Sequence, residues 1–520
     1  MMNKPKLVKI LIVLIFLIGI TSRFINIRTQ GILIDETWVV PTPACNFDGT
    51  DIYPKLFGFP QYTELPDSIR KLIKQIYYLH PIFQISARSA VSDVHPPLFY
   101  ILNYYWSRMF GYAIEAIRFP AAIYFLIAMV VLWLFLKKQG MNDRIVLYTL
   151  GLVALSPLYL FFSNFARPYT LMLLLCLGSS YMAYRMAMDR YDIKKMGLYI
   201  LLAILAAYTH YYALIVVVTQ AIYLITESCL SKKYGTLKDI VIIYLIMFIL
   251  YLPWMIVMVL QIMYRHNIVQ VGFHYFTLRS FTELLLFFGT WYSRSTMFST
   301  LNIVVSCLEV LLLISGIIYA KRNIQNPALR FWVIFLIIPF VMIAISNRLI
   351  PVFTPRNCSI ILIPYLVIIG IGIETIKKKM IKTAVIVFIG ILGIISDYHS
   401  LTYGNTKGKG AMEDWKSAGG YISNYVEKEL PVYVYYPSYR EALYYYIPDE
   451  KRIRRYETLN DRKGPVEKRF IFVLMRPEDI ALEEQMERDV PFLLDSSQFK
   501  VQMKKQVPRI VIFEVERISQ

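Results

Sequence analysis

The feature that most limits what this chain can fold into is a series of long apolar blocks. About eleven blocks of about 17–24 residues each are long enough to cross a roughly 30 Å hydrocarbon core as helices. In lipid every backbone polar group must be paired within its own segment, so such blocks must be helical. The blocks cover residues 8–27, 115–136, 144–163, 168–188, 196–212, 213–230, 239–260, 298–320, 330–347, 357–376 and 381–398. The sequence therefore predicts a mainly α, polytopic membrane bundle of about eleven transmembrane helices.

The loops between these blocks fall into two sets that differ in cation content. Lys and Arg are enriched in cytoplasmic loops, so eleven crossings and a cytoplasmic N-terminus place every cation-rich loop inside. These loops contain Lys137, Lys138, Arg144, Arg190, Lys194, Lys195, Lys232, Lys233, Lys238, Lys321, Arg322, Arg330, Lys377, Lys378, Lys379 and Lys382. We therefore predict a multi-pass protein of the inner (plasma) membrane. Its net charge of +19 is interpreted as topology signals and not as a nucleic-acid-binding surface.

Two N-terminal segments need separate treatment. Residues 8–20 follow three lysines, as in a signal peptide, but no small-residue cleavage pattern comes after them, so we predict an uncleaved anchor. Residues 95–110 are apolar and aromatic but only about fifteen residues long, which is short for a span. They are predicted to form a helix lying at the outer surface, where Tyr and Trp suit the interface. An amphipathic stretch at 67–79 and a second interfacial helix at 280–288 are also predicted.

The composition changes near residue 400. Residues 400–520 are charged and tyrosine-rich, with strand-like runs at 431–436, 469–474 and 509–514 and a helical stretch at 412–429. The predicted domains are a membrane domain over 1–399, including a long first outer loop at 28–114, and a small extracytoplasmic α/β domain over 400–520. The five cysteines are scattered without CxxC spacing, which supports neither a disulfide framework nor a zinc site.

Asp35 and Glu36 follow the first apolar block and are flanked by isoleucine and tryptophan. Carboxylates at such a membrane surface are poorly solvated, which favours a carboxylate that can act as a base. Such a base could take a proton from an attacking hydroxyl. An ordinary acidic loop is the plainer interpretation of the dipeptide alone.

Other outer segments carry polar side chains at the same predicted membrane face. They are Asp93 and His95 before a Pro-Pro pair, Arg167 and Tyr169 in a minimal loop, His210 and Tyr211 in the next outer turn, and Arg356 in the last. The plainer interpretations are a helix-capping histidine and arginines that snorkel to lipid headgroups. A guanidinium beside aromatic rings also suits a phosphate on a lipid tail. With a carboxylate base and aromatic surfaces for sugar rings, the set indicates glycosyl transfer from a lipid-linked sugar.

Two other classes of protein fit a polytopic chain. A transporter or lipid flippase would place ionisable residues near the midplane of broken helices, whereas these candidates cluster at one face. A sensor or scaffold displaying its outer domain would not need histidine and arginine in tight outer turns. The pattern therefore favours an enzyme.

The order of the motifs resembles the GT-C superfamily of membrane glycosyltransferases, in particular bacterial members akin to glycosyltransferase family 39, which includes protein mannosyltransferases and lipid A aminoarabinose transferases. The motifs are Asp-Glu at 35–36, His-Pro-Pro-Leu-Phe-Tyr at 95–100, Ala-Arg-Pro-Tyr at 166–169, His-Tyr-Tyr at 210–212, Pro-Arg-Asn at 355–357 and Asp-Trp-Lys at 414–416. The resemblance implies a polyprenyl-phosphate sugar donor, a glycan, lipid or protein acceptor, and inverting transfer on the extracytoplasmic side.

The resemblance also implies roles for individual residues. Asp35 matches the catalytic base, and Glu36 would orient the site or bind the acceptor. Arg356, with Arg167 and His95, would hold the donor phosphate and stabilise it as it leaves. One position departs from the pattern, because relatives often carry an acid where this chain has Phe165. The sequence therefore predicts no metal site and no required cofactor, with Asp93 the only nearby substitute for the missing acid.

Overall fold

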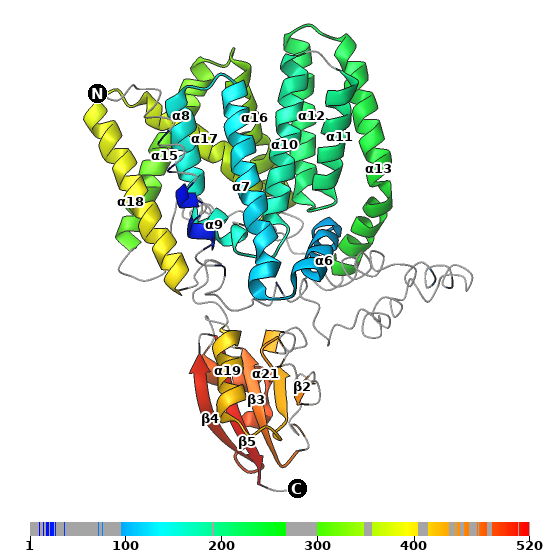
Figure 1. Ribbon diagram of the computed structural model, residues 1–520, viewed down its shortest axis with the longest axis vertical. Helices are drawn as coiled ribbons and strands as arrows, with labels where there is room; N and C mark the ends of the chain where they lie inside the picture. The colour runs from blue at the N-terminus through cyan, green and yellow to red at the C-terminus, as the bar shows by residue number, and fades with distance from the viewer. Residues whose placement is uncertain are drawn as a thin grey trace.

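The structure is a computed structural model with a helical bundle and a small sheet domain beyond one end of it (Figure 1). It describes residues 95–189, 192–266, 299–347, 356–403 and 414–435, most of 442–518, and single residues before 95, among them Arg23 and Glu36. The predicted base Asp35 and the predicted substrate residue Asp93 lie outside the described residues.

The described part of the bundle confirms the predicted mainly α, polytopic fold. Its helices are α6 (Leu98–Phe110), α7 (Ile114–Lys138), α8 (Asp143–Ala154), α9 (Pro157–Ser163), α10 (Tyr169–Met188), α11 (Ile193–Ala207), α12 (Tyr212–Leu230), α13 (Gly235–His266), α15 (Ser299–Arg322), α16 (Pro327–Ser346), α17 (Ser359–Thr375) and α18 (Lys379–Tyr403). By length and composition six of these could cross a membrane, or seven if the bent pair α8–α9 counts as one span. Every predicted block from 115–136 onward is largely helical in the described residues. The first block lies largely outside the described residues.

The predicted block 144–163 is broken in the middle. Its two halves, α8 and α9, meet at an angle of 59°. Pro157 has no backbone N–H, and Ser156 caps the new helix by accepting from the Tyr159 N–H at 3.5 Å. At the break the buried Arg23 donates to the Ala154 carbonyl at 2.7 Å. Arg23 therefore satisfies a carbonyl that the ended helix leaves unpaired.

Helix α17 is buried on all its faces and packs directly on α15. A Cβ on Gly372 would lie 2.1 Å from the Leu312 carbonyl oxygen, and one on Gly316 would lie 2.2 Å from the Ile368 carbonyl oxygen. The two backbones therefore touch, an approach that only glycine permits. This crossing fixes the helix whose first turn follows Arg356.

The segment predicted to lie at the outer surface forms the short helix α6. The helix begins at Leu98, directly after Pro97, and lies at the end of the bundle that faces the C-terminal domain (Figure 1). One side of it is buried, and the other exposes Leu102, Tyr105, Met109 and Phe110. Its 13 residues are too few to cross a bilayer, so the helix fits a place along the membrane surface. The stretches predicted at 67–79 and 280–288 lie almost entirely outside the described residues.

The C-terminal domain contains a five-stranded mixed sheet of order β2-β1-β3-β5-β4. Its elements are α19 (Trp415–Tyr425), β1 (Val432–Tyr435), β2 (Ile453–Tyr456), β3 (Arg469–Met475), α21 (Leu482–Asp489), the 3₁₀ helix η4 (Pro491–Leu494), β4 (Phe499–Val507) and β5 (Ile510–Arg517). Strands β1, β3 and β5 coincide with the predicted runs and form the centre of the sheet. Strands β2 and β4 were not predicted, because these edge strands carry arginines and lysines that hide the strand pattern.

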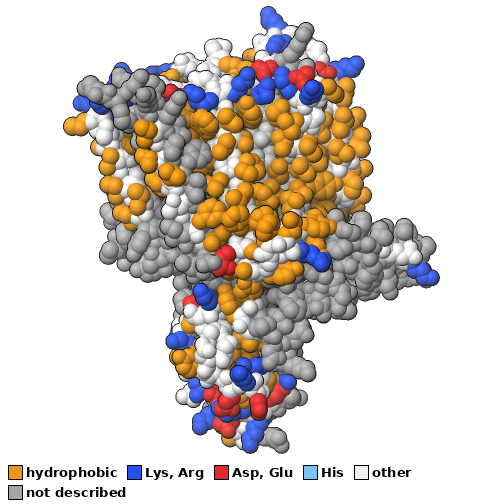
Figure 2. All heavy atoms as spheres, in the orientation of Figure 1, with side chains coloured by type: hydrophobic (Ala, Val, Ile, Leu, Met, Phe, Trp, Pro, Cys, Tyr) orange, Lys and Arg blue, Asp and Glu red, His pale blue; other side chains and the backbone are white. Residues whose placement is uncertain are grey.

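Charge is distributed unevenly over the bundle. Figure 2 shows apolar side chains along its flank, with lysines and arginines gathered at the end opposite the C-terminal domain. We call the other end, which faces the C-terminal domain, the site end.

Candidate functional site

Four predicted substrate residues come together at the site end. Arg167 donates to Nδ1 of His95 at 3.0 Å, and the rings of His95 and His210 meet edge to face at 4.6 Å. Tyr169 completes the group, with its ring centroid 5.4 Å from that of His210 and 6.2 Å from that of His95. All four side chains are buried. We call this group the His-Arg cluster.

Short turns between helices hold this cluster in place. Arg167 lies in the turn between α9 and α10, where its N–H donates to the Phe165 carbonyl at 2.7 Å. His210 lies in the turn between α11 and α12. The first N–H of α6, that of Leu98, donates to the Tyr208 carbonyl at 3.0 Å and so joins the segment after His95 to the His210 turn. Residues far apart in the sequence are therefore fixed by backbone contacts.

The hydrogen bonds define the protonation of both histidines. A guanidinium can only donate, so Nδ1 of His95 accepts from Arg167 and carries no proton. Nδ1 of His210 likewise accepts from the Tyr212 backbone N–H at 3.2 Å. With Nδ1 accepting, the ring proton of each histidine is assigned to Nε2. The cluster thus offers a guanidinium and two Nε2–H donors, a combination suited to an anion.

Glu36 is buried and bound from two sides. Arg118 Nε and Nη2 donate to its two carboxylate oxygens at 2.7 and 2.5 Å, and neither side chain is more than 1% exposed. The Ala166 N–H donates to the same carboxylate at 2.9 Å. Glu36 therefore joins the first outer loop to α7 and to the turn that carries Arg167.

Sequence reasoning missed Arg118. The available signal was an arginine five residues into an apolar helix, where a cation is costly unless it has a partner. The same signal also fits an arginine that snorkels to the interface. The sequence alone therefore did not distinguish a buried, paired arginine from a snorkelling one.

Two predicted substrate residues are placed differently from the cluster. The Tyr211 hydroxyl donates to Gln261 and accepts from the Trp254 indole at 3.1 Å, so it is bound to α13. Arg356 is partly buried and precedes α17, where its carbonyl accepts from the Ser359 N–H at 3.3 Å.

The position where relatives often carry an acid is filled by a buried ring. Phe165 stacks on Phe161 with a centroid distance of 4.6 Å. Among the described residues no group of three or more His, Cys, Asp and Glu could hold a metal ion. Asp35 and Asp93 are outside that search.

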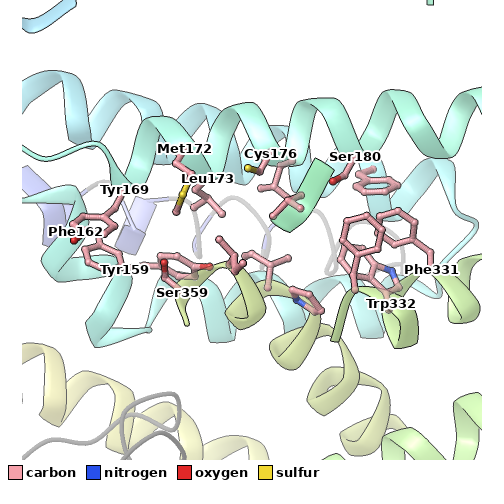
Figure 3. A pocket seen from close by; sticks show the side chains of 17 residues that line it. Tyr159, Phe162, Tyr169, Met172, Leu173, Cys176, Ser180, Phe331, Trp332 and Ser359 are labelled. Atoms are coloured by element: carbon pink, nitrogen blue, oxygen red, sulfur yellow. The ribbon is translucent and has the colours of Figure 1, made fainter. Parts of the chain in front are cut away.

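An apolar pocket lies next to the cluster. Its cavity volume is about 40 Å³, and it lies between α7, α9, α10, α12, α16 and α17. Tyr159, Tyr169 and Ser359 lie toward one end of it, and Phe331 and Trp332 lie toward the other (Figure 3). Within the described part of the chain, the buried hydroxyls of Tyr159 and Ser359 have no hydrogen-bond partner. Since Tyr169 also belongs to the His-Arg cluster, the pocket begins beside the anion donors.

Comparison with known proteins finds a family match over part of the chain and solved structures with a similar fold. Residues 94–256 match the model of the dolichyl-phosphate-mannose-protein mannosyltransferase family. The fold is similar to that of ArnT from Cupriavidus metallidurans bound to undecaprenyl phosphate, with a TM-score of 0.56, 10% identity, and coverage of 96% of this chain and 97% of that one. The apo form of that protein matches with a TM-score of 0.53, 11% identity and the same coverage. No curated protein matches the sequence.

The chain thus has a fold similar to that of ArnT along nearly its whole length. The partial family match and this similarity of fold agree with the resemblance that the sequence motifs suggest.

Proposed function

We propose that this protein is an integral membrane glycosyltransferase that moves a sugar from a polyprenyl-phosphate donor to an acceptor hydroxyl, with inversion at the anomeric carbon. The observation that carries the proposal is the His-Arg cluster beside one end of an apolar pocket. A lipid-linked sugar has an anionic phosphate between a polar sugar and an apolar tail. The site offers an anion-binding cluster and an apolar pocket side by side, which match the phosphate and the start of the tail.

The pocket suits the start of an isoprenoid tail. Its walls are aromatic and aliphatic, contributed by helices in the interior of the bundle. The hydroxyls of Tyr159 and Ser359 lie at the end near the cluster, where buried polar groups need a partner. A phosphate oxygen would supply that partner.

Asp35 is proposed as the base. Its carboxylate takes the proton of the acceptor hydroxyl as that oxygen attacks the anomeric carbon. The bond from that carbon to the phosphate oxygen breaks, and its electron pair stays on the leaving polyprenyl phosphate. Arg167 and Arg356, with the Nε2–H groups of His95 and His210, stabilise the added charge.

Glu36 is proposed to orient this base, and not to bind the acceptor. Both of its carboxylate oxygens are engaged by Arg118, and one also accepts from Ala166. The residue next to Asp35 is therefore fixed to α7 and to the turn that holds the phosphate-binding arginine. This is the kind of pre-organisation that a proton transfer requires.

The site is proposed to face the extracytoplasmic side of the plasma membrane. The cation-rich loops lie at the opposite end of the bundle, where the charge rule puts the cytoplasm (Figure 2). The N-terminus would then be cytoplasmic and the C-terminal domain outside.

The reaction is proposed to need no divalent cation. The family position that can help hold a metal is Phe165 here, a buried stacked ring that offers no ligand. We expect the rate of transfer to stay within about twofold after extensive dialysis against EDTA, since a catalytic ion supplies several kcal/mol of charge stabilisation and its loss would be far larger. Loss of activity that Mg²⁺ or Mn²⁺ restores would contradict this.

The phosphate-binding role is tested by replacing Arg356 with alanine. A panel of undecaprenyl-phosphate sugars is offered with a cell-envelope extract, and released undecaprenyl phosphate is measured. We expect kcat/KM to fall about tenfold to a hundredfold, because a hydrogen bond to a charged group is worth about 1.5–3 kcal/mol. Arg322→Ala, an exposed arginine at the opposite end, serves as the control.

An unchanged kcat/KM in Arg356→Ala would assign the phosphate to Arg167 alone. Movement of the lipid across a liposome membrane without release of sugar would instead support a lipid flippase.

A further inference from the structure

The C-terminal domain touches the bundle through a pair of tyrosines. The Tyr445 hydroxyl donates to the Tyr112 carbonyl at 3.3 Å. Ile114 is the first residue of α7, and Gly111, with φ of +88°, turns the chain just before it. A side chain of the soluble domain therefore holds the point where α7 begins.

The same tyrosines lie within electrostatic range of the buried ion pair of Glu36 and Arg118. The charges of Glu36 and Arg118 both act on the Tyr445 hydroxyl, and the Arg118 charge is also within range of Tyr446. Burial raises the pKa of Tyr445, so its hydroxyl remains protonated and able to donate. Arg118 lies one helical turn beyond Ile114. The contact at the start of α7 therefore lies one helical turn from Arg118, which binds the carboxylate next to Asp35.

Helix α19 packs closely against this tyrosine pair. A Cβ on Gly419 would lie only 2.5 Å from the Tyr446 Cβ, so the helix approaches as closely as a glycine allows. The contacting face of α19 is anchored by Trp415, Ala418 and Ile422, all fully buried. These residues share one hydrophobic cluster with the bundle, and Ile114, Tyr445 and Tyr446 pack against it.

We propose that the C-terminal domain is a working part of the active site, in which Tyr445 and Tyr446 are positioning residues for the base. Helix α19 holds the tyrosines against the start of α7, α7 carries Arg118, and Arg118 fixes Glu36 beside Asp35. This inference rests on the proposed function, because the residue finally positioned is the proposed base.

Two adjacent glycines of α19 provide a matched pair of variants. Gly419→Ala forces Tyr446 to move, whereas a Cβ on Gly420 meets nothing within 4 Å. In full-length protein in nanodiscs we expect Gly419→Ala to lower kcat by about tenfold to a hundredfold, since a displacement of about 1 Å can cost that much. The donor KM and the thermal stabilisation by undecaprenyl phosphate should stay unchanged. Gly420→Ala should match wild type in every measurement.

A double-mutant cycle separates positioning from a general structural effect. If the tyrosines act through Glu36, Gly419→Ala should add little further loss of kcat in a Glu36→Gln background. The inference would be overturned if the fold losses of kcat in the two single variants multiplied in the double variant. It would also be overturned if kcat were unchanged in Gly419→Ala. Should Gly419→Ala fail to fold, Tyr445→Phe takes its place with Tyr425→Phe as control, because Tyr425 is 78% exposed in the same domain.

A second readout keeps this inference distinct from the proposed function. Hydrogen–deuterium exchange at residues 112–118 does not depend on any reaction. Faster exchange there in Gly419→Ala than in Gly420→Ala supports the coupling even if no sugar donor is turned over, which would refute the proposed function alone. Equal exchange in the two variants refutes the coupling, whatever the activity.

Discussion

Replacing Asp35 with asparagine is expected to reduce sugar transfer by about 10²–10⁴-fold, the range for loss of a positioned general base. The amide cannot take the proton of the acceptor hydroxyl, yet it fills nearly the same space. The melting temperature and the stabilisation by undecaprenyl phosphate should therefore stay at their wild-type values. The measurement is the release of undecaprenyl phosphate from the sugar panel under single-turnover conditions.

Asp143→Asn is the matched control for this variant. Asp143 is an exposed aspartate at the opposite end of the bundle, paired with Lys137. Because exposed ion pairs contribute little, this variant should behave as wild type. Full activity in Asp35→Asn would remove Asp35 as the base and leave the site without an assigned proton acceptor.

The second large effect is expected at the ion pair behind the base. Arg118→Met should destabilise the protein by about 3–5 kcal/mol, because it leaves the Glu36 carboxylate buried without its cation. The double variant Glu36→Leu/Arg118→Met should recover most of that stability, since an apolar pair of similar volume needs no compensation. It should not recover activity. The Ala166 N–H would lose its acceptor, and the segment that carries Asp35 would no longer be anchored by Glu36.

Melting temperatures and transfer rates of the single and double variants check this prediction together. Arg322→Met, at an exposed position near the opposite end, should leave both quantities unchanged. A double variant that is active would show that the ion pair stabilises the fold without orienting the base.

The membrane helices were predictable because lipid offers no hydrogen bonds to the backbone. A block such as 115–136 must then be a helix, whatever surrounds it. The break at Pro157 was harder to predict from the sequence. A proline within a span need not end the helix there, because neighbouring groups can form hydrogen bonds with the backbone groups that it leaves unpaired. Here the neighbour is Arg23, 131 residues away in the sequence.

The candidate site was predictable only in part. His95, Arg167 and His210 were singled out because Arg167 and His210 occupy tight turns and His95 precedes a Pro-Pro pair, all at the same predicted face. Tyr211 was grouped with them because it lies in the same turn as His210. Its hydroxyl, however, is hydrogen-bonded to Gln261 and Trp254 of α13. A turn fixes which end of a bundle a residue occupies, whereas the direction of its side chain depends on helix packing.

The sequence by itself determined the helical membrane fold, the sheet strands at the centre of the C-terminal domain, and the end of the bundle at which polar residues gather. These follow from local chemistry: apolar length, strand periodicity and the placement of charge. Only the tertiary structure decided that Arg118 binds Glu36, that Tyr169 joins the anion donors to an apolar pocket, and that Tyr445 reaches the start of α7. Each of those contacts joins segments that are distant in the chain, and their partners are set by the packing of whole helices and domains.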